Sequence, residues 1–116
     1  MGLRERKGLF GGLWEFPTFE AVSGRSPVEI LEQTLRRWGI SMTVDQSLPA
    51  VSHTLTHREF TMSPFACRWV SGTLPERPSH YVRLKWVPFD EIDRMAISNL
   101  TRKIKKLMDN TFRNEK

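Results

Sequence analysis

The sequence has little of several features that assign proteins to broad classes. It contains a single cysteine, Cys67, so no intrachain disulfide can form and nothing indicates an oxidising compartment. Cys67 lies in an apolar-rich run, where a small core filler is its ordinary role. No apolar run is long enough to span a bilayer, and the N-terminus lacks the apolar segment of a signal peptide. We therefore expect an intracellular protein with no membrane partner, cytoplasmic and nucleoid-associated if it is bacterial.

Internal repeats and low-complexity tracts are also absent, and 116 residues fit one domain of ordinary size. Seven Phe and four Trp supply enough bulky side chains for one modest core without a disulfide or a metal. Lys and Arg number 18 against 13 acidic residues, which gives a formal charge of +5. This excess fits either a solvated surface or a polyanionic partner such as nucleic acid.

The clearest local pattern predicts a helix that begins after Ser26. Ser26 supplies a capping hydroxyl, Pro27 follows at the first helical position, and Glu29 stands three residues after the cap. Gly39 is placed to end the helix in a left-handed cap. The apolar residues that recur between them at helical spacing are Val28, Leu31, Leu35 and Trp38.

Residues 51–70 have the composition of strands, but their apolar alternation changes phase. Val51 and Leu55 occupy odd positions, whereas Phe60 and Met62 occupy even ones. The side chains of a regular strand alternate strictly, so we expect a turn or a bulge near residues 56–58.

After a second irregularity expected at Pro64, the C-terminal part is predicted to hold a strand, a helical turn and a helix. Residues 81–86 alternate as a strand, and residues 88–92 have the pattern of a short helical turn. A final helix begins after Ser98, with Leu100, Ile104, Leu107 and Met108 on its buried stripe. Its basic residues are Arg102, Lys103, Lys105 and Lys106. We interpret them as a solvated face, with nucleic-acid binding as the alternative.

Three segments, in this order, carry a resemblance to a known family. Residues 9–17 read LFGGLWEFP, residues 53–57 read HTLTH, and residues 84–92 read LKWVPFDEI. They resemble the glycine-rich start, the His-x-Phe-Ser-His type segment, and the final strand and turn of the C-terminal domain of MutY-type adenine DNA glycosylases. The first segment is shared loosely with Nudix hydrolases in general, whereas the second is much more particular.

This resemblance implies an α/β (α+β) fold, a Nudix-like α/β/α sandwich around a mixed β-sheet. Residues 1–116 would form a single C-terminal 8-oxoguanine-recognition domain used in base excision repair. The catalytic N-terminal domain, of helix-hairpin-helix type with a 4Fe–4S cluster, would be absent. One cysteine cannot ligate such a cluster, so we expect no cofactor and no catalytic residue in this chain. The implied partners are duplex DNA containing 8-oxoguanine opposite adenine and the glycosylase domain of the same parent protein. The resemblance implies that this parent protein hydrolyses N-glycosyl bonds.

The resemblance also places a lesion-reading loop in the segment where the alternation breaks. 8-Oxoguanine carries an acceptor at position 8 and a donor at N7, so its reader needs a short group that both donates and accepts. Thr56 matches the family's Ser and supplies such a hydroxyl. Leu55 matches the family's Phe: as an aliphatic wedge it still fills a base step, but it gives up aromatic stacking worth about 1–3 kcal/mol.

Three neighbours of Thr56 complete the expected site. His57 would hydrogen-bond a phosphate or the base, or brace the turn, and Arg58 suits a phosphate contact. His53 is expected to support the loop, with its ring bonded to backbone across the turn. Taken singly, Thr and His in such a region are usually ordinary turn residues. The coincidence of the motif with the phase break is what distinguishes them here.

The enzymatic alternative is a Nudix-type nucleotide pyrophosphohydrolase with an atypical metal site. Such an enzyme needs carboxylates massed on one helix to hold divalent cations. Aligning the family pattern on Gly39 puts Arg36 and Arg37 where two metal-binding glutamates belong, which changes the local charge from about −2 to about +2. Glu29 and Glu32 remain, and Glu29 has a capping explanation. We therefore expect no metal site. Arg36 and Arg37 either add to a basic face or are solvated.

The third reading is a module that docks only proteins.

Overall fold

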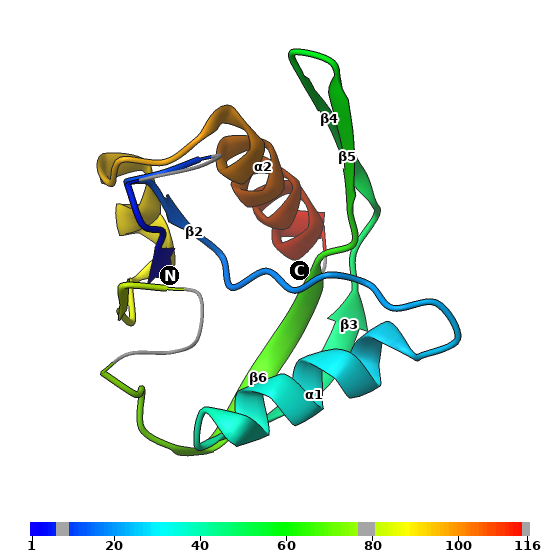
Figure 1. Cartoon of the computed structure of the whole chain (residues 1–116), viewed down its shortest axis with the longest axis vertical. Helices are drawn as coiled ribbons and strands as arrows, with labels where there is room; N and C mark the ends of the chain where they lie inside the picture. The colour runs from blue at the N-terminus through cyan, green and yellow to red at the C-terminus, as the bar shows by residue number, and fades with distance from the viewer. Residues whose placement is uncertain (7–9, 77–80, 115–116) are drawn as a thin grey trace.

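The computed structural model describes residues 1–6, 10–76 and 81–114, and its elements are arranged as an α/β fold (Figure 1). The described strands are β1 (Gly2–Leu3), β2 (Trp14–Glu15), β3 (Ile40–Ser47), β4 (Val51–Leu55), β5 (Arg58–Met62), β6 (Phe65–Gly72) and β7 (Arg83–Leu84). The helices are α1 (Pro27–Arg37), the 3-10 helix η1 (Phe89–Arg94) and α2 (Asn99–Asn114). Among the described residues, no helix has the length and apolar character to cross a membrane.

The described strands form three antiparallel sheets. The first has the order β2-β1-β7, the second joins β3 to β6, and the third joins β4 to β5. A parallel bridge between Trp14 and Ile97 links β2 to the segment before α2. The ladder of β3 and β6 carries irregularities between Ser41 and Met42 and between Val44 and Gln46. Together with the helices, these ladders form the mixed α/β fold that the sequence predicts.

Helix α1 confirms its predicted boundaries. The Ser26 hydroxyl accepts a hydrogen bond from the Glu29 backbone nitrogen at 3.5 Å, and Pro27 is the first helical residue. Gly39 has φ +87°, the left-handed backbone that ends a helix without a Cβ penalty. Leu35 and Trp38 are buried, so the predicted apolar stripe faces the core. This face lies along β3 (Figure 1).

The main core forms where α1 meets β3 and the segment before β7. Its buried residues are Leu35, Trp38, Ile40 and Tyr81. The rings of Phe19 and Tyr81 both meet Trp38 edge-on, with centroids 5.3 Å and 6.1 Å away. A second set of buried residues, Ile92, Ile97, Leu100 and Ile104, lies under η1 and α2. Apolar burial therefore holds α1 against β3, and a second buried set holds η1 and α2.

The C-terminal elements partly confirm the sequence predictions. The turn at 88–92 is η1, the helix after Ser98 is α2, and β5 and β6 are separate strands on either side of Pro64, as predicted. The strand expected over residues 81–86 is shorter, because β7 is restricted to Arg83–Leu84. Its partner β1 is only two residues long, and the ladder cannot extend beyond its partner.

Candidate nucleic-acid interface

The segment with the broken alternation is a β-hairpin that projects beside α2 (Figure 1). Strand β4 pairs with β5 in a register that sets Leu55 opposite Arg58. Thr56 and His57 form the two-residue turn between them, and both are exposed. The turn predicted near residues 56–58 is confirmed, and three of the four predicted loop residues, Leu55, Thr56 and His57, are consecutive at its tip.

Thr56 adopts a backbone conformation that its residue type disfavours. Its φ is +55°, in the left-handed region, where an L-residue costs about 1–2 kcal/mol relative to its usual wells. Two-residue hairpin turns normally meet this demand with Gly, Asn or Asp. A β-branched Thr followed by His stabilises such a turn less than these residues do. The stability of the fold therefore does not account for the residue types at the tip. Strained positions of this kind concentrate at functional sites.

The register divides the hairpin into two faces, because residues directly opposite each other point to the same side. Leu55 and Arg58 share one face with His53 and Phe60, which pair two positions further along the ladder. The ring of Phe10, from the glycine-rich segment, lies 5.9 Å from that of Phe60 on this inner face. The outer face carries exposed Thr54 and Glu59. The structure thus brings the first resemblance segment against Phe60, the residue that pairs with His53 of the second segment.

His53 is held by α2. The Lys103 ammonium nitrogen Nζ lies 3.0 Å from His53 Nδ1. An ammonium has only donors, so Nδ1 accepts and the ring proton belongs on Nε2. The supporting role expected for His53 fits this contact. Its partner, however, is a side chain fifty residues along the chain, where the sequence predicted a backbone group across the turn.

The basic residues of α2 point to two sides of the helix. Arg102, Lys103 and Lys106 are exposed. Lys105 is 7% exposed, which corrects its predicted place on the solvated face. Its Nζ donates to Asp93 at 2.7 Å, lies 3.6 Å from the Asp109 carboxylate, and sits 4.8 Å from the centre of the Phe89 ring. The hydrogen bond with Asp93 raises the pKa of Lys105 above its ordinary value. Lys105 therefore holds α2 to η1.

The face of α1 that would hold metal in a hydrolase carries mixed charges. Glu29 lies in the first turn, and Arg36 and Arg37 lie exposed in the last turn. Gln33, one turn before Arg37, accepts a hydrogen bond from the Arg25 guanidinium. Among the described residues, no three His, Cys, Asp or Glu side chains are grouped so that they could hold a metal ion.

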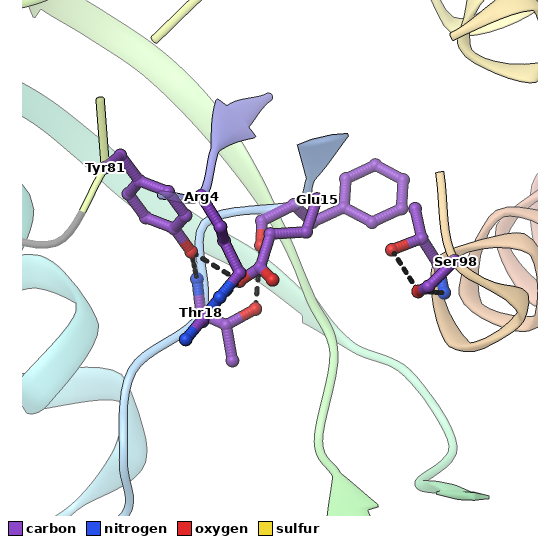
Figure 2. Close-up of polar contacts among 7 residues, drawn as sticks. Arg4, Glu15, Thr18, Tyr81 and Ser98 are labelled. Carbon is purple, nitrogen blue, oxygen red and sulfur yellow. Dashed lines mark hydrogen bonds and ion pairs between the residues drawn. The ribbon is translucent and has the colours of Figure 1, made fainter. Parts of the chain in front are cut away.

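A buried polar cluster that sequence reasoning missed fixes the segment after the glycines (Figure 2). Tyr81, 3% exposed, donates its hydroxyl proton to Glu15 Oε2 at 2.6 Å and accepts from the Thr18 backbone nitrogen at 2.9 Å. Arg4 lies 3.6 Å from the same carboxylate oxygen. Burial, and then the negative charge of Glu15, raises the pKa of Tyr81 above its ordinary value. No local pattern signals a contact between residues 66 positions apart.

Away from the hairpin, Trp69 and Trp86 are exposed and line a shallow apolar concavity of about 550 Å³. Trp69 pairs with Met42 in the ladder of β3 and β6, near the end of β6 that closes on Ile40. The hairpin joins the opposite end of β6, at Phe65. This apolar surface is therefore separate from the loop.

Comparison with protein families matches residues 1–107 to a family described as NUDIX domain. The match covers nearly the whole chain, so the protein belongs to this family, which is that of the MutY C-terminal Nudix-like domain. Membership agrees with the α/β fold and with the resemblance carried by the three sequence segments.

Proposed function

We propose that this chain is a DNA-lesion recognition module for base excision repair, reading 8-oxoguanine opposite adenine through residues 55–58. It would serve an adenine DNA glycosylase whose separate catalytic domain flips the adenine and hydrolyses its N-glycosyl bond. The observation that carries this proposal is the exposed hairpin turn, in which Thr56 holds a strained backbone that its residue type does not favour.

The chemistry of the tip fits such a reader. The Thr56 hydroxyl both donates and accepts, which matches the donor at N7 and the acceptor at position 8 of the lesion. Leu55 at the edge of the turn supplies an apolar wedge for a base step, and Arg58 opposite it supplies a cation for a phosphate. His57, exposed in the turn, adds a further hydrogen-bonding group. No catalytic role is assigned to any of the four.

A titration of the 116-residue chain with matched duplexes tests the site. Amide NMR shifts are followed while duplexes with and without 8-oxoguanine opposite adenine are added. We expect residues 53–58 to shift more with the lesion duplex, and binding to weaken steeply as salt rises. Silence of these residues while other surfaces respond would show that the loop is not the site. Failure to bind DNA at any salt concentration would favour a module that docks only proteins.

The role of Thr56 is tested by fusing the chain to an adenine glycosylase catalytic domain. Thr56→Ala should reduce the preference for 8-oxoguanine:adenine over guanine:adenine, and Thr56→Ser should restore it, because the hydroxyl returns. The matched control is Thr54→Ala, which removes the same group from an exposed position on the outer face of β4. Equal preference in the Thr56→Ala and Thr54→Ala fusions would refute base reading by Thr56.

Hydrolase activity is the remaining alternative, and it has a direct assay. The chain is incubated with magnesium and oxidised nucleoside triphosphates, and released pyrophosphate or phosphate is measured. We expect no turnover, because Arg36 and Arg37 repel a divalent cation at the end of α1 where the hydrolase pattern places carboxylates.

A further inference from the structure

Helix α2 and the inner face of the hairpin meet at one polar contact. His53 lies on the face that also carries Leu55 and Arg58, and its ring is bonded to Lys103 of α2 at 3.0 Å. Arg58 is a diagonal neighbour of His53 across the ladder, a separation of about 7–8 Å that long side chains can cover. The loop cation Arg58 and the helix cation Lys103 therefore lie on the same side of the hairpin.

The exposed cations of α2 continue this side along the helix. Arg102, Lys103 and Lys106 are exposed. Lys106 stands four residues after Arg102 and three after Lys103, so it lies between them on one side of the helix and the three form one stripe. Of the carboxylates that the structure describes, none lies within ion-pair distance of these three, whereas Asp93 and Asp109 both compensate the inward Lys105. Glu59, the hairpin's acidic residue, points to the outer face. The stripe thus presents uncompensated positive charge next to the loop.

We propose that Arg102, Lys103 and Lys106 extend the recognition loop as a phosphate-contacting stripe, so that α2 tracks the backbone of the same duplex whose lesion the loop reads. This inference rests on the proposed function and adds to it residues that lie outside the recognition loop. Lys and Arg contacts to phosphates position a protein on DNA without reading its sequence. The stripe therefore contributes equally to lesion and undamaged duplexes, whereas the loop distinguishes them.

The test uses Arg102→Ala/Lys106→Ala in the 116-residue chain, because Lys103 also supports His53 and its loss would disturb the loop. Binding to lesion and undamaged duplexes is measured by fluorescence anisotropy over a range of salt concentrations. Each phosphate contact contributes about 0.9 to the slope of log K against log salt, so losing two should lower its magnitude by about 1.8. Affinity should fall by the same factor for both duplexes.

Arg36→Ala/Arg37→Ala is the matched control, since it removes two exposed cations from the end of α1. These two residues come just before the start of β3, whereas the hairpin follows its other end. An unchanged slope for Arg102→Ala/Lys106→Ala, or an equal fall for the control, would overturn the stripe. A loss confined to the lesion duplex would also overturn it, because phosphate contacts do not discriminate. Discrimination between the two duplexes is judged separately with Thr56→Ala. If this variant discriminates as well as the wild type, the proposed function is refuted, whereas the proposal of a phosphate-contacting stripe depends on the salt slope alone.

Discussion

Thr56→Gly should make the domain more stable although it removes a side chain. At φ +55° Thr56 costs about 1–2 kcal/mol relative to a relaxed backbone, and glycine has no such penalty. Glycine loses more chain entropy on folding, about 0.5–1 kcal/mol, so the net gain in the free energy of unfolding is about 0.5–1 kcal/mol. Thr56→Ala keeps the strain and alters only an exposed side chain, so its stability should change by less than about 0.5 kcal/mol.

Urea unfolding of both variants, with thermal melting as a second measurement, checks this order. A gain of 1 kcal/mol corresponds to roughly 4 °C in Tm for a domain of this size. Gly39→Ala is the control of opposite sign, because Gly39 has φ +87° and an added Cβ would meet nothing within 4 Å. It should lose about 1 kcal/mol through the backbone alone. If Gly39→Ala behaves in this way but Thr56→Gly is less stable than Thr56→Ala, the hairpin turn is not left-handed at Thr56.

Three further predictions concern the wedge and the buried tyrosine. Leu55→Phe should tighten binding to the lesion duplex about fivefold or more, since base–aromatic stacking contributes about 1–3 kcal/mol. An anisotropy titration that shows no gain would contradict insertion of residue 55 into the base stack. Tyr81→Phe should lower the free energy of unfolding, measured in urea, by about 1.5–3 kcal/mol, because the part-buried Glu15 carboxylate loses its hydroxyl donor. A change within experimental error would show that this hydrogen bond does not stabilise the fold. Because the folded state raises the pKa of Tyr81, its contribution to stability is fully present below the unfolded pKa of about 10 and is lost as pH rises above it. Between about pH 9 and 11 the free energy of unfolding should therefore fall more steeply with pH for the wild type than for Tyr81→Phe. Equal slopes would contradict the raised pKa of Tyr81.

The features predicted correctly from the sequence depend on neighbours in the chain. The cap at Ser26, the left-handed Gly39 and the start of α2 after Ser98 follow from short-range rules of helix ends. The break at the hairpin turn was predictable because a strand cannot change the face of its apolar residues without a turn or a bulge. These rules located the turn at the tip of the hairpin, whereas the reading role of its residues comes from the family resemblance and stays a prediction.

The features that were missed depend on side chains that the fold brings together from distant segments. Glu15 meets Tyr81 across 66 residues, and His53 meets Lys103 across 50. Lys105 belongs to a basic run, and it bonds inward to Asp93, a residue of η1. Charge patterning along one helix cannot identify such a partner, so the sequence could not separate the structural lysine from the exposed ones.

Other segments hold the hairpin below its tip but not at the tip itself, and this lets the residues of the tip change without disturbing the scaffold. Phe10 packs on Phe60, and Lys103 bonds to His53, so the inner face of the hairpin is held by two other segments. Beyond these contacts, Thr56 and His57 are exposed, so apart from the backbone strain at Thr56 their side chains contribute little to folding. A sequence can therefore carry Leu55 where the family resemblance has Phe without disturbing the scaffold. Substitutions at the tip should change binding with little loss of stability, whereas substitutions at the base should change both.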